Sequence, residues 1–194
     1  MSQPELVLAS TSPFRRELLE RLAIDFQCDS PDCDETPVPG ESPQAMVQRL
    51  AEAKARSVAD RYPAALVIGS DQCAELDGKI LGKPGGFDTA FEQLKNASGR
   101  TVRFHTGLCL INSENRDLQV EDVLFDVEFR NLGDGEITRY LEKEQPYNCA
   151  GSFKSEGLGI TLFERLRGDD PTALIGLPLI ALCRMLRNQG VELP

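Results

Sequence analysis

Residues 5–22 read ELVLASTSPFRRELLERL and set the fold class. Residues 5–10 have the length and apolar character of a buried strand. Ser12 and Pro13 then supply a helix N-cap and a first-turn proline, and three leucines follow at helical spacing. The order strand, turn, helix indicates that the chain opens an α/β sheet.

The same signals recur along the rest of the chain and predict further strands and helices. Two long strands in the middle are expected to pair antiparallel, so the sheet is mixed, and we find no linker or internal repeat. The predicted fold is therefore a single α/β domain over residues 1–194. Strands are expected at 26–29, 66–70, 101–111, 120–130 and 160–166, and helices at 42–62, 87–96, 136–144 and 177–188.

Composition excludes several classes of protein. The net charge of -10 repels phosphate backbones and anionic lipid, so no nucleic-acid or membrane partner is expected. No window holds the ~18 apolar residues of a membrane span. Residues 1–5 lack the basic start of a signal peptide, which favours a cytoplasmic location.

The six cysteines and the single histidine provide no recognisable reactive site. No C-x-x-C pair is present, so a zinc site is not expected, and most of the thiols are predicted to be reduced and buried. His105 lies in a strand pattern and is interpreted as structural. Ser10 and Ser12 have no histidine in a hydrolase motif, and Asp169 to Pro171 is interpreted as a turn.

Two arginines, Arg15 and Arg16, occupy the opening turn of the first helix. Unpaired N–H groups and the helix dipole make that end favourable for anions, so cations there are mismatched unless an anion shares the space. A phosphate held by the hydroxyl of Ser10, the helix amides and both guanidinium groups would resolve the mismatch. The alternative is a capped surface helix with solvated arginines.

Two carboxylates are candidates for metal binding or proton transfer. Asp71 directly follows the apolar strand 66–70, at the end where ligands lie in α/β sheets, and Glu35 lies in the loop 34–37. Mg²⁺ commonly takes one or two carboxylates and completes its shell with phosphate oxygens and water. The alternatives are a turn-forming aspartate and a solvated acidic loop, and the sequence leaves open whether the two acids converge.

Two lysines are candidates for charge neutralisation. Lys54 falls on the apolar face of its helix, so it either snorkels past the core or points into a cleft. Lys83 lies in a glycine- and proline-rich loop, where an ammonium could stabilise a departing pyrophosphate. The alternative for Lys83 is an ordinary exposed loop lysine.

Taken together, these segments resemble the Maf family of nucleotide pyrophosphatases, and closely resemble its 7-methyl-GTP pyrophosphatase branch. The resemblance runs essentially from end to end, and its ordered motifs are more specific together than singly. Cys73 departs from the aliphatic residue expected after Asp71 and Gln72. The motifs are A-S-T-S-P-F-R-R (9–16), D-E-T-P (34–37), E-A-K-A (52–55), G-S-D-Q (69–72), G-K-P (82–84), C-A-G-S-F-K-S-E-G-L-G-I (149–160) and G-L-P-L (176–179).

The resemblance implies a fold and a set of roles. The fold is a twisted mixed sheet flanked by helices, like inosine triphosphatase, with two lobes around a cleft, and the assembly is usually a homodimer. Asp71 is the implied proton acceptor, and Glu35 and Asp71 face a divalent cation, Mg²⁺ or Mn²⁺. The residues implied to surround the phosphates are Ser10, Arg15, Arg16, Lys54 and Lys83.

The resemblance also assigns substrate choice to Phe14, Gln72 and Glu156. Methylation at N7 makes guanine cationic, so an aromatic ring can stack on the base and a carboxylate can pair with its charge. The expected reaction is hydrolysis of 7-methyl-GTP to 7-methyl-GMP and pyrophosphate, a removal of modified nucleotides. The alternatives are hydrolysis of dTTP, UTP or another modified nucleotide, and a nucleotide-binding regulator of cell division without turnover.

Overall fold

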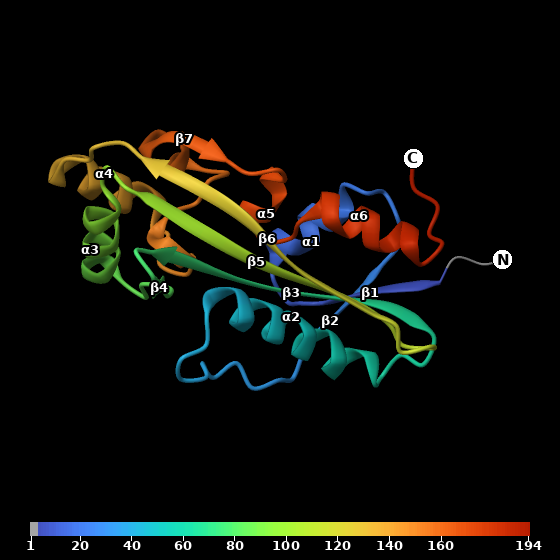
Figure 1. Ribbon diagram of the computed structural model, residues 1–194. Coiled ribbons are helices and arrows are strands. Elements are labelled where there is room, and N and C mark those ends of the chain that lie inside the picture. The colour runs from blue at the N-terminus through green and yellow to red at the C-terminus, as the bar shows by residue number, and fades with distance from the viewer. Residues whose placement is uncertain (1–3) are drawn as a thin grey trace. The chain divides into compact units, whose positions relative to one another are not determined.

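A computed structural model describes residues 4–194, and residues 1–3, part of the stretch in which no signal peptide is expected, lie outside it. Strands and helices alternate from β1 to β3, as expected for the start of an α/β sheet (Figure 1). Their bounds are β1 (Glu5–Ala9), α1 (Pro13–Glu20), β2 (Gln27–Asp29), α2 (Pro43–Ala59), β3 (Ala65–Leu76), β4 (Lys79–Leu81), α3 (Phe87–Ala97), β5 (Thr101–Asn112), β6 (Leu118–Phe129), α4 (Asp134–Glu144), β7 (Phe163–Arg167), α5 (Pro171–Ile175) and α6 (Leu179–Asn188), with short 3-10 helices η1 (Ala150–Ser152) and η2 (Leu158–Leu162).

The strands form one mixed seven-stranded sheet, which confirms the predicted fold class. Its order is β2-β1-β3-β5-β6-β7, and β4 pairs with β3 off this path. The pairs β1–β2 and β1–β3 are parallel, whereas β3–β4 and β6–β7 are antiparallel. In residues 4–194 no helix is both long and apolar enough to cross a membrane.

The chain divides into two units of contacting residues, and each is described separately. The first unit comprises the residues up to Asp71, Thr106–Val123 and Asp170–Pro194. The second comprises Gln72–His105 and Leu124–Asp169. The strands β3, β5 and β6 contribute residues to both units.

Alternation along the strands builds two cores in the first unit. Leu6 and Leu8 of β1 pack in a cluster with residues of α1 and α6, whereas Val7 and Ala9 pack in a cluster with residues of α2. Because successive strand residues point to opposite faces, α2 covers one face of the sheet and α1 and α6 the other (Figure 1).

Two glycines allow α2 to lie directly on the sheet. A Cβ at Gly69 of β3 would lie 2.1 Å from the carbonyl oxygen of Ala51, and one at Gly107 of β5 would lie 2.1 Å from that of Val47. Any side chain at these positions would meet the backbone of α2, which cannot move aside like a flexible side chain. The distance between α2 and the sheet therefore depends on both glycines.

An aromatic cluster organises the second unit. The rings of Phe104, Phe129, Phe153 and Phe163 meet edge to face, with centroids 4.9 to 5.4 Å apart. Edge-to-face contacts of this kind are favourable beyond the burial of ring surface. Phe153 contacts the other three rings, and it follows η1 directly in the chain. The cluster thereby fixes the segment after η1 to the strands.

Two predicted strands have different bounds in the structure, and the short elements β4 and α5 were not predicted. The strand expected at 66–70 continues to Leu76, because Ala74, Glu75 and Leu76 pair with β4 across a tight turn. Residues 160–162 belong to η2, so the strand expected from 160 begins only at Phe163. The helix α5 was not predicted, since residues 169–171 were interpreted as a turn.

We expect Gly69→Ala to lower the free energy of unfolding by about 3 kcal/mol or more, because the new Cβ overpacks against backbone. Urea denaturation and the Tm measure the effect. Gly133→Ala is the matched control: Gly133 has φ of -84° and open space within 4 Å of an added Cβ. Equal stability of the two variants would contradict the close packing of α2.

Candidate active site

A buried ammonium group lies between two carboxylates in the first unit. The Nζ of Lys54 is 2.6 Å from Oδ1 of Asp71 and 3.2 Å from Oε2 of Glu35. The side chains of Lys54 and Asp71 are only 8% and 12% exposed, whereas that of Glu35 is 58% exposed. The two acids whose convergence the sequence left open are therefore brought together by Lys54.

The position of Lys54 follows from the packing of α2. Lys54 shares the buried face of the helix with Leu50, Ala51 and Val58, as its spacing predicted. The glycine contact at Gly69 holds that face against β3, two residues before Asp71. A buried charge needs a partner, and the adjacent carboxylate supplies it.

Asp71 lies inside β3 rather than after its end, which corrects the predicted strand-terminal position. The strand runs on because it forms a hairpin with β4 across Asp77 and Gly78, which both adopt positive φ, 50° and 78°. An Asp-Gly pair is a strong hairpin signal, and it was the sequence feature that could have extended the strand. Asp71 is held by strand backbone, which orients its side chain more rigidly than a loop would.

Internal contacts shape the acidic loop that carries Glu35. The carboxylate of Asp34 accepts the N–H of Thr36 at 2.9 Å, and hydrogen bonds from Thr36 lower the pKa of Asp34. Arg49 of α2 donates from Nε and Nη2 to Glu41 at 2.7 Å each. Arg49 thus ties the end of the loop to α2, a role that the sequence analysis missed because the partner is eight residues away in an irregular segment.

Arg15 joins the same group of charges. Its Nε donates to the carbonyl oxygen of Gly176 at 2.9 Å, and the Oγ of Ser70 lies 2.9 Å from the same oxygen. Burial lowers the pKa of Arg15, and the negative charges of Asp71 and Glu35 oppose that change. Arginine remains protonated in proteins, so the group contributes a fixed positive charge beside the two acids.

The two other predicted phosphate ligands at this helix have different surroundings. Ser10 is buried, and its Oγ accepts the N–H of Ser12 at 3.1 Å. Arg16 is largely exposed and pairs with Glu20 one turn further along α1 at 3.0 Å. Exposed pairs of this spacing contribute little stability, so a bound anion could displace Glu20 at small cost.

Asp170 fixes the segment that contains Gly176, and it corrects the turn expected at 169–171. It is the N-cap of α5, where Oδ1 accepts the N–H of Thr172 at 2.9 Å, and its Oδ2 accepts the N–H of Ile180 at 2.7 Å. The side chain is buried. One carboxylate therefore joins the starts of α5 and α6, and Gly176 ends α5 with φ of 125°.

The other predicted polar residues, Gln72, Lys83 and Glu156, lie in the second unit, where the segments after Lys83 and before Cys149 meet. Gly85, in the loop after Lys83, donates its N–H to the carbonyl oxygen of Tyr147 at 3.0 Å, two residues before Cys149. Burial raises the pKa of Cys149; among the nearby charges, those of Lys154 and Lys83 lower it and that of Glu156 raises it. Gln72 lies in β3 and is partly buried.

The thiols are all free, and fewer are buried than expected. Cys73 and Cys109 are buried, Cys28 is exposed, and the other three are intermediate. Burial raises the pKa of Cys109 to about 12, so its thiol is unreactive at neutral pH. The Nε2 of His105 lies 3.2 Å from Oε2 of Glu75 in the second unit, whereas the acids that bind Lys54 belong to the first.

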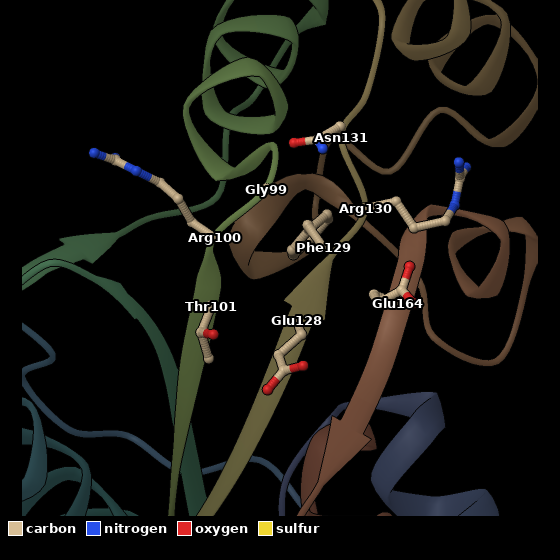
Figure 2. A pocket seen from close by; sticks show the side chains of 8 residues that line it. All are labelled: Gly99, Arg100, Thr101, Glu128, Phe129, Arg130, Asn131 and Glu164. Carbon is tan, nitrogen blue, oxygen red and sulfur yellow. The ribbon is translucent and has the colours of Figure 1, made fainter.

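The second unit also contains a polar depression. It occupies about 350 Å³ and is lined by residues at the start of β5, the end of β6 and β7 (Figure 2). Glu128 pairs with Arg167 at 2.8 Å, and Arg130 pairs with Glu136. Figure 2 shows the side chains of Arg100 and Arg130 pointing away from one another, so they do not converge on a ligand.

The donor set in the first unit fits a hard cation that arrives with phosphate. In residues 4–194 no cluster of three or more His, Cys, Asp or Glu side chains could hold a metal by itself. Glu35 and Asp71 supply two carboxylates, which is the number Mg²⁺ commonly takes from protein when phosphate oxygens and water fill its other positions.

These features define a mixed α/β protein with a basic and acidic polar site beside a sheet. The sequence matches the family described as Maf-like protein over residues 5–189, and the chain belongs to this family. The fold is similar to that in "The structure of the Staphylococcus aureus Ham1 protein", with a TM-score of 0.54 and 16% identity over 95% of this chain and 99% of that one. Family membership supports a nucleotide pyrophosphatase activity in general terms.

We expect Lys54→Met to lower the free energy of unfolding by about 3 kcal/mol, because it leaves Asp71 buried without its ammonium partner. Urea denaturation measures the loss, and a double variant with Asp71→Asn should recover part of it. Lys95→Met is the control, since its pair with Asp134 is 51% and 65% exposed and should contribute under about 1 kcal/mol. Additive effects of Lys54→Met and Asp71→Asn would contradict a coupled pair.

Proposed function

We propose that this protein hydrolyses nucleoside triphosphates to the monophosphate and pyrophosphate, with 7-methyl-GTP as the preferred substrate. The observation that carries the proposal is the contact of Lys54 with both Asp71 and Glu35, beside the positive charge of Arg15. Such a group can bind a polyphosphate and accept a proton. A protein that only bound the triphosphate would gain little from two carboxylates next to it.

In the proposed step, the oxygen of a water molecule attacks the α-phosphorus, and the bond from that phosphorus to the bridging oxygen of the β-phosphate breaks. The electron pair of that bond leaves with pyrophosphate. Asp71 accepts the proton of the attacking water. Because Lys54 donates to Oδ1 of Asp71, the attacking water would donate its proton to Oδ2.

The positive groups would oppose the charge of the substrate and of the departing pyrophosphate. Arg15 and Lys54 are held by hydrogen bonds to protein groups, which reduces the reorganisation that binding a phosphate would require. Ser10, Arg16 and Lys83 are proposed to complete the phosphate contacts. In a protein with a net charge of -10, such a local cluster is needed to hold a triphosphate.

A divalent cation, Mg²⁺ or Mn²⁺, would be held by Glu35 and Asp71 together with phosphate oxygens, and would polarise the phosphoryl group. Lys54 contacts both carboxylates in the structure, so its ammonium would have to share them with that cation. Glu35 is the more exposed of the two acids and can adjust its position more easily than Asp71.

The preference for 7-methylguanine is proposed from Phe14, Gln72 and Glu156. Phe14 would stack on the cationic base, Glu156 would supply the opposite charge, and Gln72 would offer an amide to the base edge. Glu156 is exposed and accepts a hydrogen bond from the Ser155 hydroxyl at 3.2 Å, so its carboxylate remains accessible. We also propose that the protein is cytoplasmic and forms a homodimer.

The first test measures pyrophosphate release from 7-methyl-GTP, GTP, dTTP, UTP and CTP with Mg²⁺ or Mn²⁺. We expect the wild type to prefer 7-methyl-GTP, EDTA to abolish turnover, and Asp71→Asn to lower kcat by about 100-fold or more through loss of the proton acceptor. Asp60→Asn changes an exposed acid at the C-terminal end of α2, and as the control it should leave kcat unchanged.

The outcomes of this test separate the alternatives. Preference for dTTP or UTP would retain the reaction and overturn the substrate. Normal turnover by a folded Asp71→Asn protein would overturn the assigned proton acceptor. Absence of turnover with every nucleotide, together with a nucleotide-dependent rise in Tm, would favour a binding regulator instead.

We expect Glu156→Gln to lower the ratio of kcat/KM for 7-methyl-GTP over GTP by about 10-fold, since it removes a charged partner of the base. Steady-state kinetics on both nucleotides give the ratio. Glu164→Gln, which changes an exposed acid elsewhere in the second unit, should leave it unchanged. An unchanged ratio in Glu156→Gln would contradict charge recognition.

A further inference from the structure

Glu144 is the last residue of α4, and its carboxylate is in an unfavourable place for helix stability. The C-terminal end of a helix carries unpaired carbonyl groups and the negative end of the dipole, so an acid there is repelled. The side chain of Glu144 is nevertheless only 14% exposed. An acid that is largely shielded from water and mismatched with its helix requires partners outside the helix.

Those partners lie in the segment that carries Glu156. One oxygen of Glu144, Oε2, accepts the N–H of Leu158 at 2.6 Å. The other, Oε1, lies 3.5 Å from the Nζ of Lys154. A Cβ at Gly157 would lie 2.7 Å from Oε2 and 3.0 Å from Oε1 of Glu144, so only glycine allows the carboxylate to approach this closely.

The same segment is anchored on its N-terminal side. The N–H of Lys154 donates to the hydroxyl of Tyr140 at 3.1 Å, and the preceding Phe153 belongs to the aromatic cluster. Gly159 packs against the backbone of Lys154, where an added Cβ would lie 2.2 Å from the carbonyl oxygen. Glu156 therefore lies between two fixed points, and its side chain is exposed at the tip.

The charges of Lys154, Glu144 and Glu156 link this arrangement to substrate choice. Lys154 is two residues from Glu156, and the charges of Lys154, Glu144 and Glu156 all act on Cys149, which places them in one neighbourhood of the second unit. With its ammonium beside Glu144, Lys154 is neutralised by that acid. Within the described residues, Glu156 forms no ion pair, and its hydrogen bond comes from the Ser155 hydroxyl.

We propose that Glu144 is a positioning residue for substrate selection: it holds Leu158 by hydrogen bond and keeps the Lys154 ammonium from Glu156, so that Glu156 presents an uncompensated negative charge to a cationic base. The inference rests on the proposed preference for 7-methyl-GTP and adds the residue that makes this preference effective. Loss of the Glu144 charge releases Lys154, which then neutralises Glu156 and competes with the base.

The test variant is Glu144→Gln, because its amide oxygen can still accept the N–H of Leu158 while the charge is removed. We expect the ratio of kcat/KM for 7-methyl-GTP over GTP to fall about 5- to 10-fold, carried by KM for 7-methyl-GTP, with kcat for GTP within about twofold of wild type. The double variant Glu144→Gln/Lys154→Met should restore most of the ratio, since it removes the released ammonium as well.

Two controls separate this role from a structural one. Glu142→Gln removes an exposed acid from the same turn of α4 and should leave the ratio unchanged. The exchange rate of the Leu158 amide hydrogen should rise in Glu144→Ala and stay near wild type in Glu144→Gln. A protein that is simply less stable would lose activity on both nucleotides together.

The outcomes separate the positioning role of Glu144 from the proposed preference for 7-methyl-GTP. A wild type that prefers 7-methyl-GTP while Glu144→Gln keeps that preference overturns the positioning role and leaves the proposed function standing. Failure of Lys154→Met to restore the ratio in the double variant also overturns it. A wild type without preference for 7-methyl-GTP contradicts the proposed substrate before any variant is made, and the positioning role falls with it.

Discussion

The contact between the backbone of α2 and the glycines of β3 and β5 is the constraint on which the site depends. Without side chains at Gly69 and Gly107, the helix lies directly against the strands. Lys54 is carried to within hydrogen-bond distance of Asp71 by that approach. A wider separation would expose both charges to water, where the pair would lose most of its strength and its fixed geometry. Packing and chemistry are therefore set by the same two positions.

Several residues of the proposed site, and the residue proposed to position it, break local rules of stability. Arg15 and Arg16 lie at a helix start that favours anions, Lys54 lies on an apolar helix face, and Glu144 lies at a helix end that favours cations. Arg15, Lys54 and Glu144 are matched by groups from other elements, whereas Arg16 pairs with Glu20 of its own helix. Such conflicts between local preference and tertiary contact are expected where function rather than stability determines the residue.

Most of the fold could be predicted from the sequence, because strand and helix signals are local. The N-cap residues Ser12 and Ser42 marked two helix starts within one residue. The continuation of β3 and the short helix α5 were missed, since each depends on pairing or capping by residues further along the chain. Single members of the site were visible as charges in unusual places. Arg49, Asp170 and Glu144 were not, because their roles arise from contacts with loops whose course no periodicity describes.

The carbonyl group of Gly176 has a consequence for the order in which the molecule is completed. It receives the guanidinium of Arg15 and lies beside the hydroxyl of Ser70, although 161 residues separate it from the arginine. Chains fold progressively as they leave the ribosome, with N-terminal segments first. The opening strand and helix can therefore form early in synthesis, yet Arg15 has no fixed orientation until residue 176 emerges. The proposed nucleotide site is therefore completed late, and a truncated product that ends before residue 176 would lack the carbonyl group that orients Arg15.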